Sequence, residues 1–185
     1  HIPKPQILNR QSLQALKDKH SELLHIISSY IKEVIYFMPP ESVVIEVYTA
    51  DSILIERFGT MPGITDVCYP LGSRITKREF GNTAIGSCLW HRAPAIVSMD
   101  EHFLNIFKTA ICICMPIYNS YNNIIAAINI MLNEKHYSGN IFGIISIMAE
   151  KIQNELILKS ERTKLKISNQ ALEELNTGVR NMASL

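Results

Sequence analysis

Apolar side chains recur at alternating spacings of three and four residues between Gln11 and Met38. This spacing is typical of a helix with one apolar stripe, and it forms a heptad seam whose only polar member is a histidine. A second apolar flank widens the stripe, so we expect the helix to pack both on its own sheet and on a partner helix before it ends at Pro39-Pro40. The seam consists of Leu13, Leu16, His20, Leu23, Ile27, Tyr30, Val34 and Phe37.

Two pairs of segments rich in β-branched residues predict two hairpins. Residues 42–49 and 52–58 are separated only by Ala50-Asp51. Residues 110–118 and 124–132 are joined by a connector of asparagine, serine and tyrosine, which suits a turn. No charged residue occurs across the second pair, so we expect these two strands to be central in a sheet and buried on both faces.

The segment between the hairpins is irregular. Residues 59–80 contain three glycines and two prolines and predict a long loop, a kind of segment that often carries function. A short helix over 82–91 should follow, opened by Asn82 or Thr83 as its cap and stopped before Pro94. A short strand over 95–99 and a turn of helix over 100–107 complete the segment.

A long helix is predicted from about Gly139 onward. Its first apolar stripe is formed by Ile141, Ile145, Met148, Ile152 and Leu156. Beyond this stripe, leucine and valine recur every seven residues, which is typical of a two-stranded coiled coil. We therefore divide the chain into an arm (1–10), one domain (11–158) and a helical linker (159–185). The sevenfold positions are Leu158, Leu165, Leu172 and Val179.

The order of these elements predicts an α+β domain: a central antiparallel sheet with helices on both faces. At 185 residues, with 47% apolar and 19% charged residues, the chain is long and apolar enough for a full core, which excludes a disordered chain. The net charge of +1 gives no electrostatic reason to expect direct nucleic-acid or membrane binding.

The first residues of the chain and its cysteines suggest where the protein is located and whether the sequence is a fragment. No run of about 18 uncharged apolar residues spans a bilayer, and the first residues form no signal peptide. Cys68, Cys88, Cys112 and Cys114 form no C-x-x-C pair. A reducing cytoplasm with free thiols is therefore expected. Because the sequence starts at His1 rather than methionine, we expect a fragment of a longer protein.

Three short motifs resemble a known family. They are G-N-T-A-I-G at 81–86, E-H-F at 101–103 and I-C-I-C-M-P-I at 111–117. Together they resemble the GAF sensory domain of sigma-54-dependent transcriptional activators, the group that includes acetoin- and dihydroxyacetone-type regulators. The resemblance covers roughly residues 11–158.

The resemblance implies a fold and a set of partners. The terminal helices should pack together on one sheet face, and the central loops and short helices should cover a pocket on the other. A small organic effector would bind there and regulate an ATPase domain and a DNA-binding domain of the full-length protein. No G-x-x-x-x-G-K-[ST] motif of such an ATPase is present in this chain.

The expected pocket lies between the sheet and residues 64–107, with a volume of roughly a few hundred Å³. Cys112 and Cys114 are two apart on a strand and should share a face, either as thiol contacts or as small core residues. His102 either binds a polar ligand group or caps its local turn. The candidate lining residues are Ile85, Cys88, Leu89, His102, Phe103, Cys112 and Cys114.

A parallel homodimer is expected to form along the first helix and the C-terminal helix. Its candidate interface residues are Leu16, Leu23, Ile27, Val34, Leu158, Leu165 and Leu172.

No catalytic constellation, metal site or cofactor motif is found, so we do not expect an enzyme. Three functions remain open. The first is an effector-sensing domain of a transcriptional regulator. The second is a redox or metal sensor that uses the cysteines. The third is a dimerisation and protein-docking module without a ligand.

Overall fold

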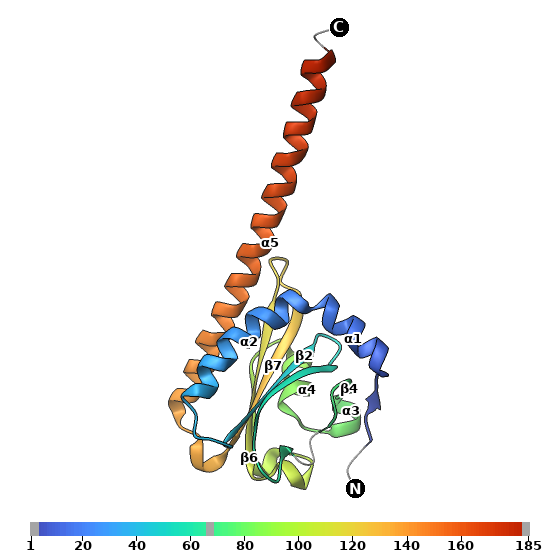
Figure 1. The fold of residues 1–185 in the computed structure, drawn as a ribbon. Coiled ribbons are helices and arrows are strands. Elements are labelled where there is room, and N and C mark those ends of the chain that lie inside the picture. Colours follow the sequence, from blue (N-terminus) through green and yellow to red (C-terminus); the bar gives the residue numbers. More distant parts are fainter. Residues whose placement is uncertain (1–3, 66–68, 183–185) are drawn as a thin grey trace.

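Five antiparallel strands form the central sheet of the protein, in the order β3-β2-β7-β6-β5 (Figure 1). The computed structural model describes residues 4–65 and 69–182. The strands are β2 (Val43–Thr49), β3 (Leu54–Thr60), β5 (Ala95–Ser98), β6 (Ala110–Tyr118) and β7 (Ile124–Asn133). Both predicted hairpins are present. β6 and β7 lie inside the sheet, as predicted from the absence of charged residues in both strands.

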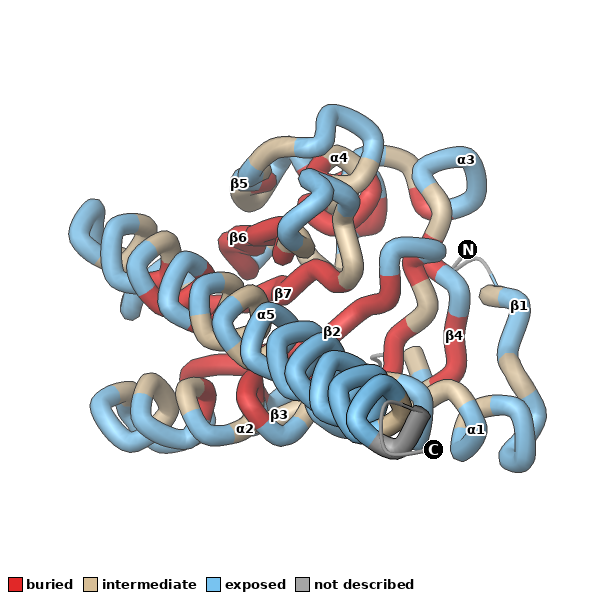
Figure 2. Tube along the Cα trace, turned by 90° about the horizontal axis from the view of Figure 1, so that it is seen from above, coloured by how far each residue is buried: buried red, intermediate tan, exposed pale blue. Residues whose placement is uncertain are grey.

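Alternation along the central strands separates two hydrophobic layers. Ile45, Ile113 and Ile130 face one side, where α2 (Ser21–Tyr36) and the first half of α5 (Gly139–Met182) cover them. Val44, Cys112 and Met131 face the other side, beneath α4 (Ala84–His91). Figure 2 shows the buried strands between these helices. The expected α+β architecture, with helices on both faces, is therefore confirmed.

The N-terminal region differs from the predicted arm and single helix. The helix is divided at His20 into α1 (Arg10–Lys19) and α2, and the His20 N–H is shared between the carbonyls of Leu16 and Lys17. α1 contains no buried residue, whereas α2 packs on the sheet. The apolar spacing continues through the break because apolar side chains of both helices pack against the same core cluster.

Part of the predicted arm also belongs to the fold. Residues Gln6–Ile7 form β1, which pairs with β4 (Ser73–Arg74) in a separate two-stranded sheet. A ladder of two residues is held by backbone groups, so it leaves no periodicity of side chains in the sequence. The expected loop over 59–80 likewise contains β4 and the one-turn helix α3 (Lys77–Phe80).

The layer that covers the second sheet face is built from short elements. Thr83 caps α4 by accepting the Gly86 N–H at 3.1 Å, whereas the Asn82 side chain donates to the Glu101 carbonyl. After β5, two 3-10 turns (Met99–Glu101 and Asn105–Phe107) lead into β6. Pro94 separates α4 from β5, as predicted.

The C-terminal helix α5 is continuous over 44 residues and leaves the domain about halfway along its length (Figure 1). Ile145, Met148 and Ile152 of its first half are buried against the sheet. Leu158, Leu165 and Leu172, farther along the helix, are exposed. Within the part of the chain that the structure describes, no helix combines the length and the apolar character that a membrane span requires.

Two of the candidate dimer residues face the domain itself, which corrects the expected interface. Leu23 is buried, and Ile27 is 0% exposed in the layer between α2 and the sheet. Leu16 and Val34 are partly buried against the same layer. One stripe at helical spacing cannot cover a sheet and a partner helix at once. The three leucines of α5 therefore remain the accessible candidates for an interface.

Candidate functional site

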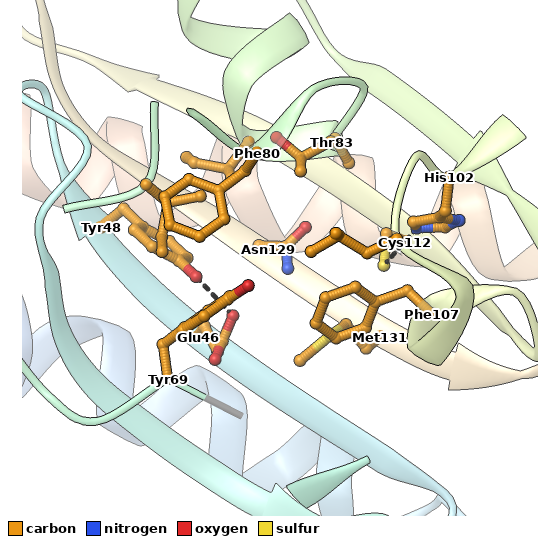
Figure 3. A pocket seen from close by; sticks show the side chains of 14 residues that line it. Glu46, Tyr48, Tyr69, Phe80, Thr83, His102, Phe107, Cys112, Asn129 and Met131 are labelled. Carbon is orange, nitrogen blue, oxygen red and sulfur yellow. Dashed lines mark hydrogen bonds between the residues drawn. The ribbon is translucent and has the colours of Figure 1, made fainter. Parts of the chain in front are cut away.

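A cavity of about 40 Å³ lies between the sheet and the layer that includes α3, α4 and the 3-10 turns (Figure 3). Its position is the expected one, but it is smaller than expected because aromatic side chains occupy much of the space. Tyr69 and Phe80 meet there edge to face, with ring centroids 4.9 Å apart. The lining includes Glu46, Tyr48, Tyr69, Ile75, Phe80, Thr83, Ala84, Ile85, His102, Leu104, Phe107, Cys112, Asn129 and Met131.

A row of polar side chains crosses the cavity face of the sheet. Cross-strand pairing places Arg57 opposite Glu46, Glu46 opposite Asn129, and Asn129 opposite Cys114. Residues paired directly across neighbouring strands project to the same face. Residues distant in the sequence are thus brought into one line by strand register.

The Glu46 carboxylate is 4% exposed and fully engaged. Its Oε1 accepts from Arg57 Nη2 at 2.7 Å and from Arg57 Nε at 3.0 Å. Its Oε2 accepts from the Tyr48 hydroxyl at 2.6 Å, a contact visible in Figure 3. Arg57 also donates to the Tyr69 carbonyl at 2.5 Å. Because a buried carboxylate needs a partner of opposite charge, this pair places a neutralised ion pair at the cavity wall.

Asn129 is the second buried polar group of the row, at 5% exposure. Among the described residues, its Oδ1 atom has no hydrogen-bond partner. Buried polar atoms are nearly always paired in folded proteins, and an unpaired one costs about 1–3 kcal/mol. The amide therefore gives the cavity wall one hydrogen-bonding position that the protein itself leaves open.

His102 and Cys112 meet on the opposite side of the cavity (Figure 3). His102 Nε2 lies 3.2 Å from Cys112 Sγ, and Nδ1 lies 3.2 Å from the Met99 carbonyl. Burial lowers the pKa of His102, although the Met99 carbonyl and Glu101 act in the opposite direction. In the neutral ring, Nδ1–H donates to Met99 and Nε2 accepts from the thiol, so His102 both caps its turn and reaches the cavity.

The other two described cysteines lie beside the cavity. Cys88 of α4 and Cys114 of β6 are both buried in the same hydrophobic cluster. Burial, followed by the contact with Cys88, raises the pKa of the Cys114 thiol. Cys68 lies outside the described residues. Throughout the described chain, no group of three or more His, Cys, Asp or Glu side chains is arranged to hold a metal ion.

The structure divides the predicted lining residues into two sets. Ile85, His102 and Cys112 line the cavity. Cys88 and Cys114 do not line it, because both are buried in the hydrophobic cluster around the cavity.

Leu89 and Phe103 are also corrected, because neither side chain lines the cavity. Leu89 lines a shallow surface groove next to Trp90. Phe103 is 67% exposed and covers Gly81, whose φ is +67°. A side chain at Gly81 would collide with Phe103, because a Cβ atom there would lie 2.7 Å from the Phe103 Cβ.

Sequence reasoning missed the polar row. Asn129 is the only polar residue in I-I-A-A-I-N-I-M-L, and Glu46 interrupts V-V-I-E-V-Y. A polar residue within a strand buried on both faces is a signal in itself, since it must find a partner or a ligand. The partners, by contrast, depend on strand register and are not visible in the sequence.

A chain of contacts connects the cavity layer to the C-terminal helix. Arg92 ends α4 in a left-handed conformation (φ 53°), and its Nη2 donates to the Asn122 carbonyl at 2.6 Å in the β6–β7 turn. Its guanidinium also lies 5.9 Å from the ring centroid of Tyr118, whose hydroxyl donates to the Arg92 carbonyl. The end of α4 is thus attached to the hairpin.

The same hairpin contacts α5 at two places. The Tyr118 N–H donates to Gln153 Oε1 at 3.0 Å, and Lys164 Nζ lies 4.9 Å from the Tyr121 ring centroid. Lys164 also donates to the Tyr121 hydroxyl at 3.3 Å. In Figure 1, α5 passes the tip of this hairpin where the helix leaves the domain.

The sheet order, the two helices on one face and the short elements over a cavity on the other define a GAF-like fold. The crystal structure of the E. coli DhaR(N)-DhaL complex matches with a TM-score of 0.81 over 94% of this chain and 60% of that chain, at 14% identity. The GAF domain/HD domain protein from Geobacter sulfurreducens matches with a TM-score of 0.51, at 12% identity, over 80% of this chain and 96% of that chain.

One curated relative is similar over nearly the whole chain. It is the "Signal-transduction and transcriptional-control protein" of Clostridium beijerinckii, 20% identical over 189 residues, which cover 96% of this chain and 29% of the relative. This chain therefore spans less than a third of that protein. No family model matches the chain.

Proposed function

We propose that this chain is an effector-sensing, non-enzymatic domain of a transcriptional regulator that acts in the cytoplasm. A small organic effector binds in the cavity between the sheet and α4, and its presence changes the position of α5. The longer protein carries the ATPase and DNA-binding domains that the sequence motifs imply for a sigma-54-dependent activator.

The observation that carries this proposal is the physical link between the cavity and α5. Ala84 and Ile85 at the start of α4 line the cavity, and Arg92 at its end bonds to the β6–β7 turn. The hairpin in turn contacts Gln153 and Lys164. Movement of α4 on ligand binding would therefore be transmitted through the hairpin to α5, where this helix leaves the domain. The regulatory names of the similar proteins support the same function.

The exposed leucines of α5 extend the proposal to a homodimer. Leu158, Leu165 and Leu172 recur every seven residues on a helix that has left its own domain. Two such helices pack their seams together in a parallel coiled coil. In such a dimer, the two sensor domains would be joined through one coiled coil, formed by their two α5 helices.

Native mass spectrometry of protein purified from growing cells tests whether the cavity holds an effector. We expect a retained organic mass that is lost in Ala84→Leu, which fills the cavity by overpacking. His91→Leu on the exposed side of the same helix is the matched control and should keep the adduct. Absence of any adduct, together with no thermal shift from small-molecule cell fractions, would refute the effector function.

A protein-docking function is the second candidate, favoured by apolar residues exposed on the layer above the cavity. Trp90 is 73% exposed, Phe103 is exposed as well, and Ile96 is exposed on the neighbouring edge strand β5. The similar E. coli structure is a complex of DhaR(N) with DhaL. Under this alternative, a partner protein would press on the cavity layer, and Trp90→Ala would weaken complex formation while leaving ligand binding intact.

A further inference from the structure

We propose that residues 6–19 form an N-terminal strap that closes the cavity, and that release of this strap admits small molecules. The strap consists of β1 and α1, and Figure 2 shows β1 on the outer side of β4. The inference goes beyond the proposed effector function, because it concerns how the cavity is reached, whatever molecule binds there. It rests on the position of β4, on the weak attachment of the strap and on one buried hydroxyl group without a partner.

The strap holds a segment that belongs to the cavity wall. Tyr69 and Ile75, which precede and follow β4 in the sequence, both line the cavity. On the inner side of this segment, the Gly72 N–H donates to the Leu54 carbonyl of β3 at 2.7 Å. On its outer side, the Leu8 N–H donates to the Gly72 carbonyl at 3.0 Å, directly beyond the β1–β4 ladder. Without the strap, β4 would be an open edge that is held on one side only.

The strap is attached to the rest of the domain by weak contacts. α1 has no buried residue, and its Leu13 and Leu16 are only partly buried against the core. Lys17 forms an ion pair with Glu56 at 2.7 Å, but the two side chains are 26% and 27% exposed, and such pairs contribute little. The helix is divided at His20, so the strap can turn there while α2 stays packed on the sheet. Such a segment can open locally without unfolding of the domain.

A buried hydroxyl group favours this opening. Ser73 of β4 pairs with Ile7 across the β1–β4 ladder and is 0% exposed. Within the described chain, the Ser73 Oγ has no hydrogen-bond partner. A buried hydroxyl without a partner destabilises the closed arrangement, and water pairs with it once the ladder opens. The strap is therefore held less firmly than a strand whose polar groups are all paired.

The thiol of Cys112 can report how often the cavity opens. Cys112 lines the cavity, whereas Cys88 and Cys114 are buried nearby without lining it. The folded protein is treated with iodoacetamide, and tandem mass spectrometry follows the labelling of each cysteine separately. We expect Cys112 to be labelled faster than the other two, whose labelling reports global unfolding. The reagent needs no effector, so the result does not depend on the proposed function.

Leu8→Pro removes the N–H group that bonds to the Gly72 carbonyl. It should accelerate the labelling of Cys112 roughly five- to tenfold, the equilibrium effect of one lost hydrogen bond. Leu8→Ala keeps the N–H group and is the matched control, expected to be labelled at nearly the native rate. Cys88 and Cys114 should remain slow in both variants. An unchanged rate at Cys112 in Leu8→Pro, or equal acceleration of all three thiols, would overturn the inference.

Ser73→Ala should have the opposite effect. It removes the unpaired hydroxyl, so the strap should be held more firmly and Cys112 labelled more slowly than in the native protein. Faster labelling of Cys112 in Ser73→Ala would also overturn the inference. Should Leu8→Pro not fold, Ile7→Gly takes its place, because glycine weakens a strand without removing a donor. This variant must accelerate the labelling of Cys112 alone.

Discussion

Arg57 and Glu46 face each other across the β2–β3 ladder, and the guanidinium Nη2 lies 2.7 Å from the carboxylate Oε1. The carboxylate is buried, so it depends on this one cation. We expect Arg57→Met to lower the free energy of unfolding by about 3–5 kcal/mol, because a buried charge is left unpaired. Urea denaturation followed by circular dichroism measures this change.

A matched control is the Lys17–Glu56 pair, which has the same 2.7 Å separation but is more exposed on both sides. Lys17→Met should cost less than about 1 kcal/mol. Adding Glu46→Gln to Arg57→Met should recover much of the lost stability. Equal losses for Arg57→Met and Lys17→Met would contradict the assignment of Glu46 as a buried charge.

The stability of the protein should fall as the pH drops below about 6.5, the ordinary histidine pKa. Burial lowers the pKa of His102 in the folded protein, so the unfolded chain binds a proton that the folded chain does not. The stabilisation is therefore present above the unfolded pKa and is lost as the pH falls toward the folded one. Denaturation midpoints between neutral and mildly acidic pH should change less in His102→Gln.

His20 contributes to the same pH range, since burial and then Lys19 lower its pKa. The variant that replaces both histidines should have the flattest profile. If His102→Gln keeps the full pH dependence of the native protein, the ring is not held neutral in the cavity.

The three described thiols should react slowly with thiol reagents in the native protein. Cys88, Cys112 and Cys114 are buried, and burial raises the pKa of Cys114. A reactive thiol needs exposure and a lowered pKa. In a Cys68→Ser background, we expect these three to be titrated only after denaturation. Rapid labelling of Cys112 or Cys114 in the folded protein would favour the redox sensor instead.

The exposed stripe on α5 should hold two chains together. Light scattering is expected to give about twice the 21.0 kDa of one chain. Leu165→Glu should shift the protein toward the monomer, because a charge would be buried in an apolar seam. Thr163→Glu, on another side of the helix, is the control. A monomer at tens of micromolar protein would exclude this interface.

Arg92→Ala tests the attachment between α4 and the hairpin. Alanine has a similar conformational cost in the left-handed region, so the change reports mainly the loss of the guanidinium contacts. We expect faster amide hydrogen exchange in residues 118–124 and around Gln153, with the melting temperature little changed. Arg78→Ala on α3 is the control. Unchanged exchange in the hairpin would show that Arg92 does not hold it.

The strands and the layers follow from the sequence because burial imposes regular patterns. The nine residues of β6 and the ten of β7 carry no charge, and this places them inside the sheet. Thr83 and Pro94 mark the two ends of α4 by local chemistry alone. The two-residue strands β1 and β4 lack any such pattern, and only the tertiary structure pairs them.

The site was predicted less completely, for a different physical reason. Ile85, His102 and Cys112 occur in motifs that the sequence displays, and all three line the cavity. Glu46 and Asn129 become neighbours only through the register of β2 against β7. Ile27 illustrates the converse difficulty, since one apolar stripe fits a core and an interface equally well, and its complete burial assigns it to the core.

The alternation along β6 has a consequence for engineering. Ile111, Ile113, Met115 and Ile117 seat the helix layer, whereas Cys112 and Cys114 belong to the cavity side. In the proposed sensor, ligand preference and helix attachment would therefore depend on alternate positions of β6. A library restricted to position 112 of β6 and positions 129 and 131 of β7 would change the cavity wall and leave the residues that pack against α5 unchanged. Biosensors for other small molecules could then be made from this domain without changing its C-terminal helix.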